Sequence, residues 1–115
     1  MIWTLTQVAF GGAIGAVLRF VTVASFGAPW AVLAVNVVGS FAMGVAFGVL
    51  SARLSPFVMT GVLGGFTTFS AFSLDALKLW EAGQVGPAVL YVGGSVVLSL
   101  GAVALGAALA RGVWA

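Results

Sequence analysis

The stretch that decides the fold of this chain is GVLGGFTTFSAFSLD, residues Gly61–Asp75. It lies within an apolar segment that is long enough to cross a membrane, yet it contains paired glycines followed by two adjacent threonines. Glycines weaken a helix, and threonine side chains compete for its backbone hydrogen bonds. A broken backbone is tolerated in hydrocarbon only where protein or a water-filled cavity satisfies it. The stretch therefore predicts an interrupted membrane helix beside a pore or a binding site.

The composition places the chain among integral membrane proteins. Of its 115 residues, 63% are hydrophobic and only 5% are charged, and a spanning helix needs about 20 mostly apolar residues. Four such stretches fit, at roughly residues 2–26, 30–52, 56–79 and 85–110. We therefore expect an all-α integral membrane protein, a single four-helix transmembrane domain over residues 1–115, with both termini on the same side of the membrane.

The residue types on which most enzyme mechanisms depend are missing. The chain has no cysteine and no histidine, which excludes a disulfide, a thiolate nucleophile, an imidazole base and the usual zinc and haem ligands. Its two carboxylates, Asp75 and Glu81, have no evident nucleophile or base as a partner. We expect that the protein is not an enzyme.

The positive charges give the chain no preferred orientation in the membrane. Lysine and arginine normally gather in cytoplasmic loops, but Arg53 and Arg111 belong to the side of the N-terminus, while Arg19 and Lys78 belong to the other. A chain without this bias can insert both ways up, and two opposite copies would form an antiparallel dimer with an in-plane two-fold axis. The alternative is an ordinary weak bias, in which Arg19 snorkels or is functional and is not counted.

Polar residues inside the expected spans are candidate functional residues, because each is costly in lipid without a partner. Asn36 and Ser40 lie one turn apart on the same face. The amide of Asn36 either donates to an anion or water or holds two helices together. Tyr91, Ser95 and Ser99 recur every four residues. These hydroxyls either line a narrow aqueous path or bond back to their own helix.

Arg19, Phe69 and Phe72 add charge and aromatic edges to this set. Arg19 closes the first span, where it either anchors the helix at the interface or raises the anion concentration at a vestibule. Phe69 and Phe72 lie three residues apart directly after the expected break, beside Ser70. Phenylalanines in membrane helices usually pack against lipid or protein. The edge of an aromatic ring is positive, however, so two edges turned into a pore would help to coordinate an anion.

These residues resemble the Fluc (CrcB) family of fluoride channels. The matching motifs are GGAIGAVLR at residues 11–19, NVVGS at residues 36–40 and, most specific of the three, GGFTTFSAFS at residues 64–73. With the length and the four spans, the resemblance covers essentially the whole chain. Two positions depart from the family's pattern, since Ala71 stands where threonine is frequent and Asp75 where glutamate is common.

The resemblance implies an antiparallel, dual-topology homodimer in the bacterial inner membrane. Its two pores would conduct fluoride passively out of the cytoplasm and so give fluoride resistance, with fluoride, sodium, the lipid bilayer and a second copy of the chain as partners, and no nucleic acid. The third helix is broken in this family. A sodium ion would lie at the dimer centre, held by the backbone carbonyls of Gly64 and Thr67 from each subunit.

The resemblance also implies a set of residues along the fluoride path. Phe69 and Phe72 would supply ring edges, and Arg19 would lie toward an entrance. Hydrogen-bond donors would come from Asn36, Ser70, Tyr91, Ser95 and Ser99.

Two other classes of protein stay open on the residues alone. A small multidrug-type proton-coupled exporter has a similar length, four spans and dual topology, but it needs an ionisable group buried in the membrane. That group is usually a carboxylate in the first span, and this first span has none. A non-transporting scaffold subunit would use its intramembrane polar residues only to hold helices together, which leaves the glycine and threonine motif unexplained.

Overall fold

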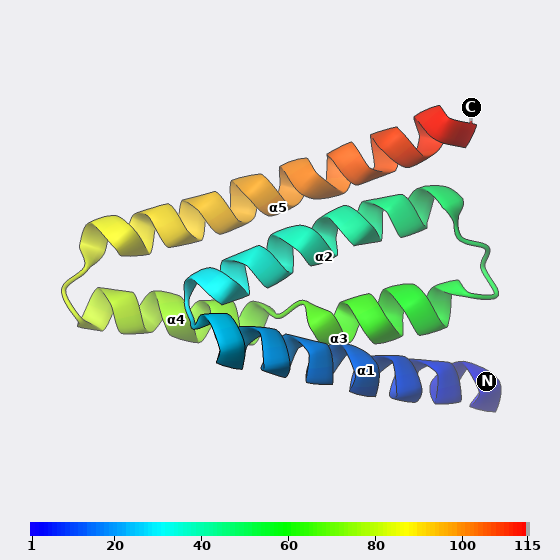
Figure 1. Ribbon diagram of the computed structural model, residues 1–115, viewed down its shortest axis with the longest axis horizontal. Helices are drawn as coiled ribbons and strands as arrows, with labels where there is room; N and C mark the ends of the chain where they lie inside the picture. Colours follow the sequence, from blue (N-terminus) through cyan, green and yellow to red (C-terminus); the bar gives the residue numbers. More distant parts are fainter. Residues whose placement is uncertain (115) are drawn as a thin grey trace.

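The computed structural model describes residues 1–114, with side chains described through residue 112. The helices within this range are α1 (Ile2–Phe26), α2 (Trp30–Val49), η1 (Pro56–Leu63), α3 (Gly64–Phe66), α4 (Phe69–Glu81) and α5 (Val85–Trp114). They run back and forth along one direction, and the two termini lie at the same end of the molecule (Figure 1). This is the arrangement that an even number of spans requires.

Four helical segments are long and apolar enough to cross a membrane, which confirms the prediction of an all-α chain with four spans. They are Ile2–Phe26, Trp30–Val49, Pro56–Glu81 and Val85–Gly112. The second span ends at Val49 instead of residue 52, because the backbone becomes extended at Leu50, with ψ 142°. The third span continues past residue 79 to Glu81, and α5 continues past residue 110.

The end of α4 has a local backbone cause. Gly83 has a φ of 78°, in the left-handed region that favours glycine. Its amide donates to the carbonyl of Trp80 at 3.0 Å, and the amide of Gln84 donates to Leu79 at 2.9 Å. This pair of bonds is the Schellman arrangement, which closes a helix and satisfies its last carbonyls. The helix therefore ends where the glycine permits the turn.

Glycines on the contact faces of the helices determine which helices pack closely against each other. α1 packs along η1 and α3, while α2 packs along α5. A Cβ atom added at Gly11 would lie 2.8 Å from the Cα atom of Gly61, and one added at Gly15 would overlap the backbone of the third span. Added Cβ atoms at Gly44 and Gly106 would likewise overlap the backbones of α5 and α2. Small residues let membrane helices approach closely, so these faces fix the two pairings.

The third span loses its helical conformation at two threonines. Thr67, with φ −85° and ψ 157°, and Thr68, with φ −153° and ψ 124°, are extended between α3 and α4. The hydroxyl of Thr68 then accepts a hydrogen bond from the amide of Ala71 at 3.2 Å and so caps α4. Gly64 stays helical, and the two halves of the span remain in line (Figure 1). The predicted interruption is thus confined to the threonines and does not include the glycines before them.

A small buried core joins α2, α4 and α5. It contains Val32, Phe72 and Tyr91, whose exposed fractions are 2%, 8% and 0%. The Phe72 and Tyr91 rings lie 5.3 Å apart between centroids. This core places the first turn of α4 directly beside α2 and α5, next to the break.

Candidate functional site

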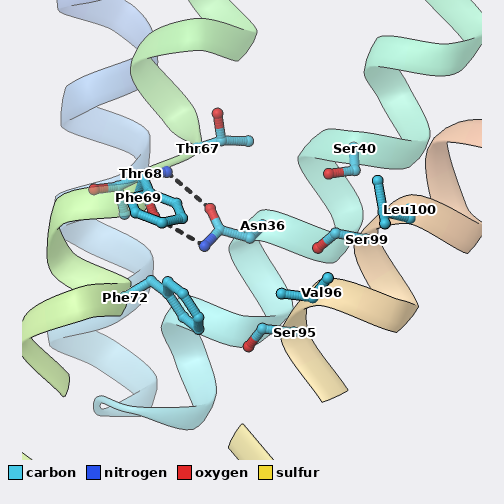
Figure 2. A pocket seen from close by; sticks show the side chains of 10 residues that line it. All are labelled: Asn36, Ser40, Thr67, Thr68, Phe69, Phe72, Ser95, Val96, Ser99 and Leu100. Carbon is cyan, nitrogen blue, oxygen red and sulfur yellow. Dashed lines mark hydrogen bonds between the residues drawn. The ribbon is translucent and has the colours of Figure 1, made fainter. Parts of the chain in front are cut away.

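A pocket of about 320 Å³ lies between the break, α2 and α5 (Figure 2). Its lining residues are Asn36, Ser40, Thr67, Thr68, Phe69, Phe72, Ser95, Val96, Ser99 and Leu100. They bring an amide, several hydroxyls and two aromatic rings together from three parts of the chain. A small anion that leaves water must exchange its water hydrogen bonds for protein ones, and this pocket offers donors inside an apolar molecule.

Asn36 reaches from α2 to the break. Its Nδ2 atom donates to the carbonyl of Thr68 at 3.0 Å, and its Oδ1 atom accepts from the amide of Thr68 at 2.8 Å (Figure 2). One side chain therefore satisfies both backbone groups of a residue that has left the helix. The amide group of asparagine has two N–H donors, and these bonds use one of them.

Phe69 and Phe72 both line the pocket, but their surroundings differ. The two ring centroids lie 5.4 Å apart with the planes tilted by 56°. Phe72 is buried in the core, whereas the side chain of Phe69 is 76% exposed. The ring of Phe69 therefore lies on the open side of the pocket and is largely uncovered by the described residues.

The hydroxyl series on α5 divides between two environments. Ser95 and Ser99 line the pocket. Ser95 is 5% exposed, and its Oγ atom has no hydrogen-bond partner among the described residues. Tyr91 lies outside the pocket lining and donates instead to Oδ2 of Asp75 at 3.3 Å. A serine in a helix can return its proton to a carbonyl one turn back, so the hydroxyl of Ser95 is a donor that its own helix does not use.

Arg19 and Ser70 lie against the break, outside the pocket lining. The Nη1 atom of Arg19 donates to the carbonyl of Thr67 at 3.4 Å, and the Arg19 side chain is half-buried. The Oγ atom of Ser70 lies 3.4 Å from Oγ1 of Thr68. Both side chains therefore contact threonines that line the pocket. The place of Arg19 toward an entrance, which the resemblance implies, stays a prediction.

Two backbone carbonyls at the break have lost the amides that a continuous helix would give them. The amide of Thr68, which would reach Gly64, donates to Asn36. The amide of Ala71, which would reach Thr67, donates to the hydroxyl of Thr68. Within the described residues, no group of three His, Cys, Asp or Glu side chains could hold a metal ion. Carbonyl oxygens are ligands that hard cations accept, so the donors at Gly64 and Thr67 suit such an ion.

The sequence reasoning missed the roles of Thr68 and Asp75. Thr68 is 9% exposed, caps α4 and pairs with Asn36 through its backbone. Asp75 is also 9% exposed, and its partner is Tyr91. A signal for Asp75 was present, because it lies three residues after Phe72 and so shares the face of α4 that meets α5. The signal for Thr68 was its position as the residue before a new helix, where threonine commonly caps.

The fold and the site define a small four-span membrane protein with a polar and aromatic pocket beside an interrupted helix. The chain belongs to the CrcB family, because the family described as CrcB-like protein, Camphor Resistance (CrcB), matches residues 6–107. This confirms the resemblance drawn from the motifs. The chain is similar to proteins named fluoride-specific ion channel FluC. In Ruegeria sp. (strain TM1040) the relative is 54% identical over 98% of each chain. In Cereibacter sphaeroides (strain ATCC 17029) it is 54% identical over 97% of this chain and 98% of the relative. In Agrobacterium fabrum the relative is 45% identical over 96% of this chain and 98% of the relative.

Proposed function

We propose that this chain forms a fluoride-selective channel in a bacterial inner membrane. Fluoride would leave the cytoplasm passively through it, which would give the cell resistance to fluoride. The name of the relatives, fluoride-specific ion channel, supports this function at 45% to 54% identity over nearly the whole chain. Four helices suited to cross a membrane support a multi-pass location.

The observation that carries the proposal is the unbonded hydroxyl of Ser95 in a pocket that also holds aromatic rings. Leaving a buried polar group without a partner costs about 1–3 kcal/mol, and an anion in the pocket would accept its proton. Asn36 and Ser99 line the same pocket and offer further donors. The positive edges of Phe69 and Phe72 suit an anion as well. The preference for fluoride over larger anions is inferred from the name of the relatives, fluoride-specific ion channel.

Replacing Ser95 by alanine is expected to lower fluoride flux by about tenfold without destabilising the protein. A hydrogen bond to a charged group contributes about 1.5 kcal/mol or more, and about 1.4 kcal/mol corresponds to a factor of ten. Stability should hold or rise, because the substitution removes a buried hydroxyl that has no protein partner. The measurements are fluoride efflux from liposomes and the thermal unfolding midpoint in detergent.

The control for Ser95→Ala is Thr22→Ala. The hydroxyl of Thr22 bonds to the Leu18 carbonyl within α1 and lies outside the pocket lining, so its removal should leave fluoride flux unchanged. Fluoride flux of Ser95→Ala equal to that of the unmodified protein would contradict the role of this hydroxyl.

The working unit that we propose is an antiparallel homodimer with two pores and dual topology. Arg19 bonds to the break. Without it, Arg53 and Arg111 lie at one end against Lys78 at the other, a weak bias of one positive charge, which is small enough to permit insertion in both directions. The 76% exposed ring of Phe69 also leaves one side of the pocket open, and a second copy would close it.

A single cysteine at Gln84 tests this topology, because the chain has no other cysteine. Gln84 lies in the exposed turn between α4 and α5. With Gln84→Cys in intact cells, an impermeant maleimide is expected to label about half of the protein, and the rest only after permeabilisation. Ser51→Cys at the opposite end should give the same half-labelling. Complete labelling of one variant and none of the other would establish a single orientation and contradict the proposal.

We also propose a sodium ion at the dimer centre, bound by the carbonyls of Gly64 and Thr67 from each protomer. The oxygens are available as ligands because the amides that would occupy them in a helix donate elsewhere. The Thr67 oxygen also accepts a long hydrogen bond of 3.4 Å from Arg19. A two-fold axis would double two ligands to four. The ion would supply positive charge that holds the two break segments together.

A further inference from the structure

We propose that Asn36 is a positioning residue for the cation site. By binding the amide of Thr68, it takes away the donor that would otherwise close the helix onto the carbonyl of Gly64. The carbonyl of Gly64 is thereby left open to a sodium ion. The carbonyl of Thr67 loses its helical amide to the Thr68 hydroxyl instead, and Arg19 lies 3.4 Å from it. This inference rests on the proposed sodium site and adds to Asn36 a role other than donating to fluoride.

The hydrogen bonds along the third span show where the helix gives way. In an α-helix each amide donates to the carbonyl four residues earlier. The first part of the third span, η1, is a π-helix, and α3 after it is an α-helix. The amide of Thr67 donates to the carbonyl four residues earlier, that of Leu63, at 3.0 Å. The next amide, that of Thr68, donates instead to Oδ1 of Asn36 at 2.8 Å. The helical pattern therefore stops at the residue that Asn36 binds.

The second bond of Asn36 fixes the direction of the break. Its Nδ2 atom donates to the carbonyl of Thr68 at 3.0 Å, so the side chain holds both backbone groups of one extended residue. Thr68 is 9% exposed, and a buried backbone group in a membrane protein needs a partner. Without Asn36 the accessible partner for the amide of Thr68 is the carbonyl of Gly64, and that bond would restore the helix and occupy the ligand.

Asn36 acts from a rigid support. It lies on α2, whose packing against α5 is close enough that a Cβ atom at Gly44 would overlap the α5 backbone. The break is thus tied to a helix pair that does not include the third span. Because Asn36 also lines the pocket, the same side chain connects the proposed fluoride path with the proposed sodium site.

The test measures sodium binding without any fluoride flux. Purified full-length protein in detergent is unfolded thermally while sodium chloride replaces N-methylglucamine chloride at constant ionic strength. Binding to the folded state raises the unfolding midpoint. We expect sodium to raise the unfolding midpoint of the unmodified protein. The Asn36→Leu protein should need at least about tenfold more sodium to reach half of its maximal increase in midpoint, or its midpoint should not increase at all.

The matched control is Ser40→Ala. Ser40 lies one turn from Asn36 on the same face of α2 and lines the same pocket, but it makes none of the bonds to Thr68. Its sodium response should equal that of the unmodified protein. If Asn36 acted only as a donor to fluoride, Asn36→Leu would lower fluoride flux and leave the sodium response unchanged, and this result would overturn the inference.

Asn36→Asp keeps the test decisive if Asn36→Leu does not fold. Protonated aspartic acid has the same length as asparagine, with one oxygen that accepts from the amide of Thr68 and one O–H that donates to the carbonyl of Thr68. A folded Asn36→Asp protein should therefore keep its sodium response at a pH at which this carboxyl is protonated. A folded Asn36→Asp protein without that response would overturn the inference. So would an unmodified protein that does not respond to sodium, which would remove the sodium site as well. Neither result bears on the channel function, which is tested separately by fluoride efflux.

Discussion

Replacing Phe69 by isoleucine is expected to lower fluoride flux by about tenfold or more while the protein stays folded. The ring lines the pocket but is 76% exposed in the protomer, so little of the protomer's own packing depends on it. Isoleucine keeps the apolar bulk and removes the positive ring edge. A loss of about 1.4 kcal/mol in anion stabilisation corresponds to tenfold. Fluoride efflux from liposomes measures the effect.

The control for Phe69→Ile is the same substitution at Phe10. Phe10 is 66% exposed on α1 and does not line the pocket, so Phe10→Ile should conduct normally. Phe72→Ile should also reduce flux, but it alters the core that Phe72 shares with Tyr91 and should cost about 1 kcal/mol of stability. Normal flux in Phe69→Ile would contradict the role given to the ring edges.

Gly15→Ala is expected to destabilise the protein by about 3 kcal/mol. The added methyl group would overlap the carbonyl oxygen of Val62 and the amide nitrogen of Phe66. These are backbone atoms, which cannot rotate aside as a side chain does, and overpacking of this kind costs about 1–3 kcal/mol or more. α1 would have to move away from the third span, which carries the break. The measurement is the thermal unfolding midpoint, together with the yield of folded protein.

Gly12→Ala makes the same chemical change in the same helix, where an added Cβ atom meets nothing within 4 Å. Alanine is a better helix former than glycine by about 0.5–1 kcal/mol, so this variant should be equally stable or more stable. Equal stability of Gly12→Ala and Gly15→Ala would contradict the packing of α1 against the third span.

The four spans were predictable because each is a long apolar run, but hydropathy did not locate all their ends. Leu50 and Ala52 are as apolar as the helix before them, so the sequence offered no reason to stop at Val49. The end of α4 depends on the left-handed turn at Gly83. The ends of these helices are therefore set by backbone geometry and not by the apolar pattern.

The sequence predicted that the third span is interrupted, but it did not predict the residues at which the helix stops. Both the glycines and the threonines weaken a helix, and the one local signal that favours Thr68 is that threonine commonly caps a following helix. The distinction comes from Asn36, which lies 32 residues before Thr68 and binds its backbone. That contact depends on how α2 is placed and rotated against the third span, which a single sequence does not encode locally.

Most residues that line the candidate pocket were named from the sequence. Tyr91 was named as well, but it lies outside the lining. Residues four apart on a helix drift by about 40° at each step, so Tyr91 is turned by about 80° from Ser99. Ser95 and Ser99 face the pocket, whereas Tyr91 faces α4 and meets Asp75. A regular spacing therefore predicted a shared stripe, but the angle between α4 and α5 decided which hydroxyls share a cavity.

The measurement that tests the channel most directly is ion efflux from liposomes that contain the purified unmodified protein. Fluoride and chloride are followed with ion-selective electrodes while an ionophore clamps the membrane potential. We expect rapid loss of fluoride with chloride retained. Retention of fluoride by liposomes that hold the verified folded protein would contradict the channel function.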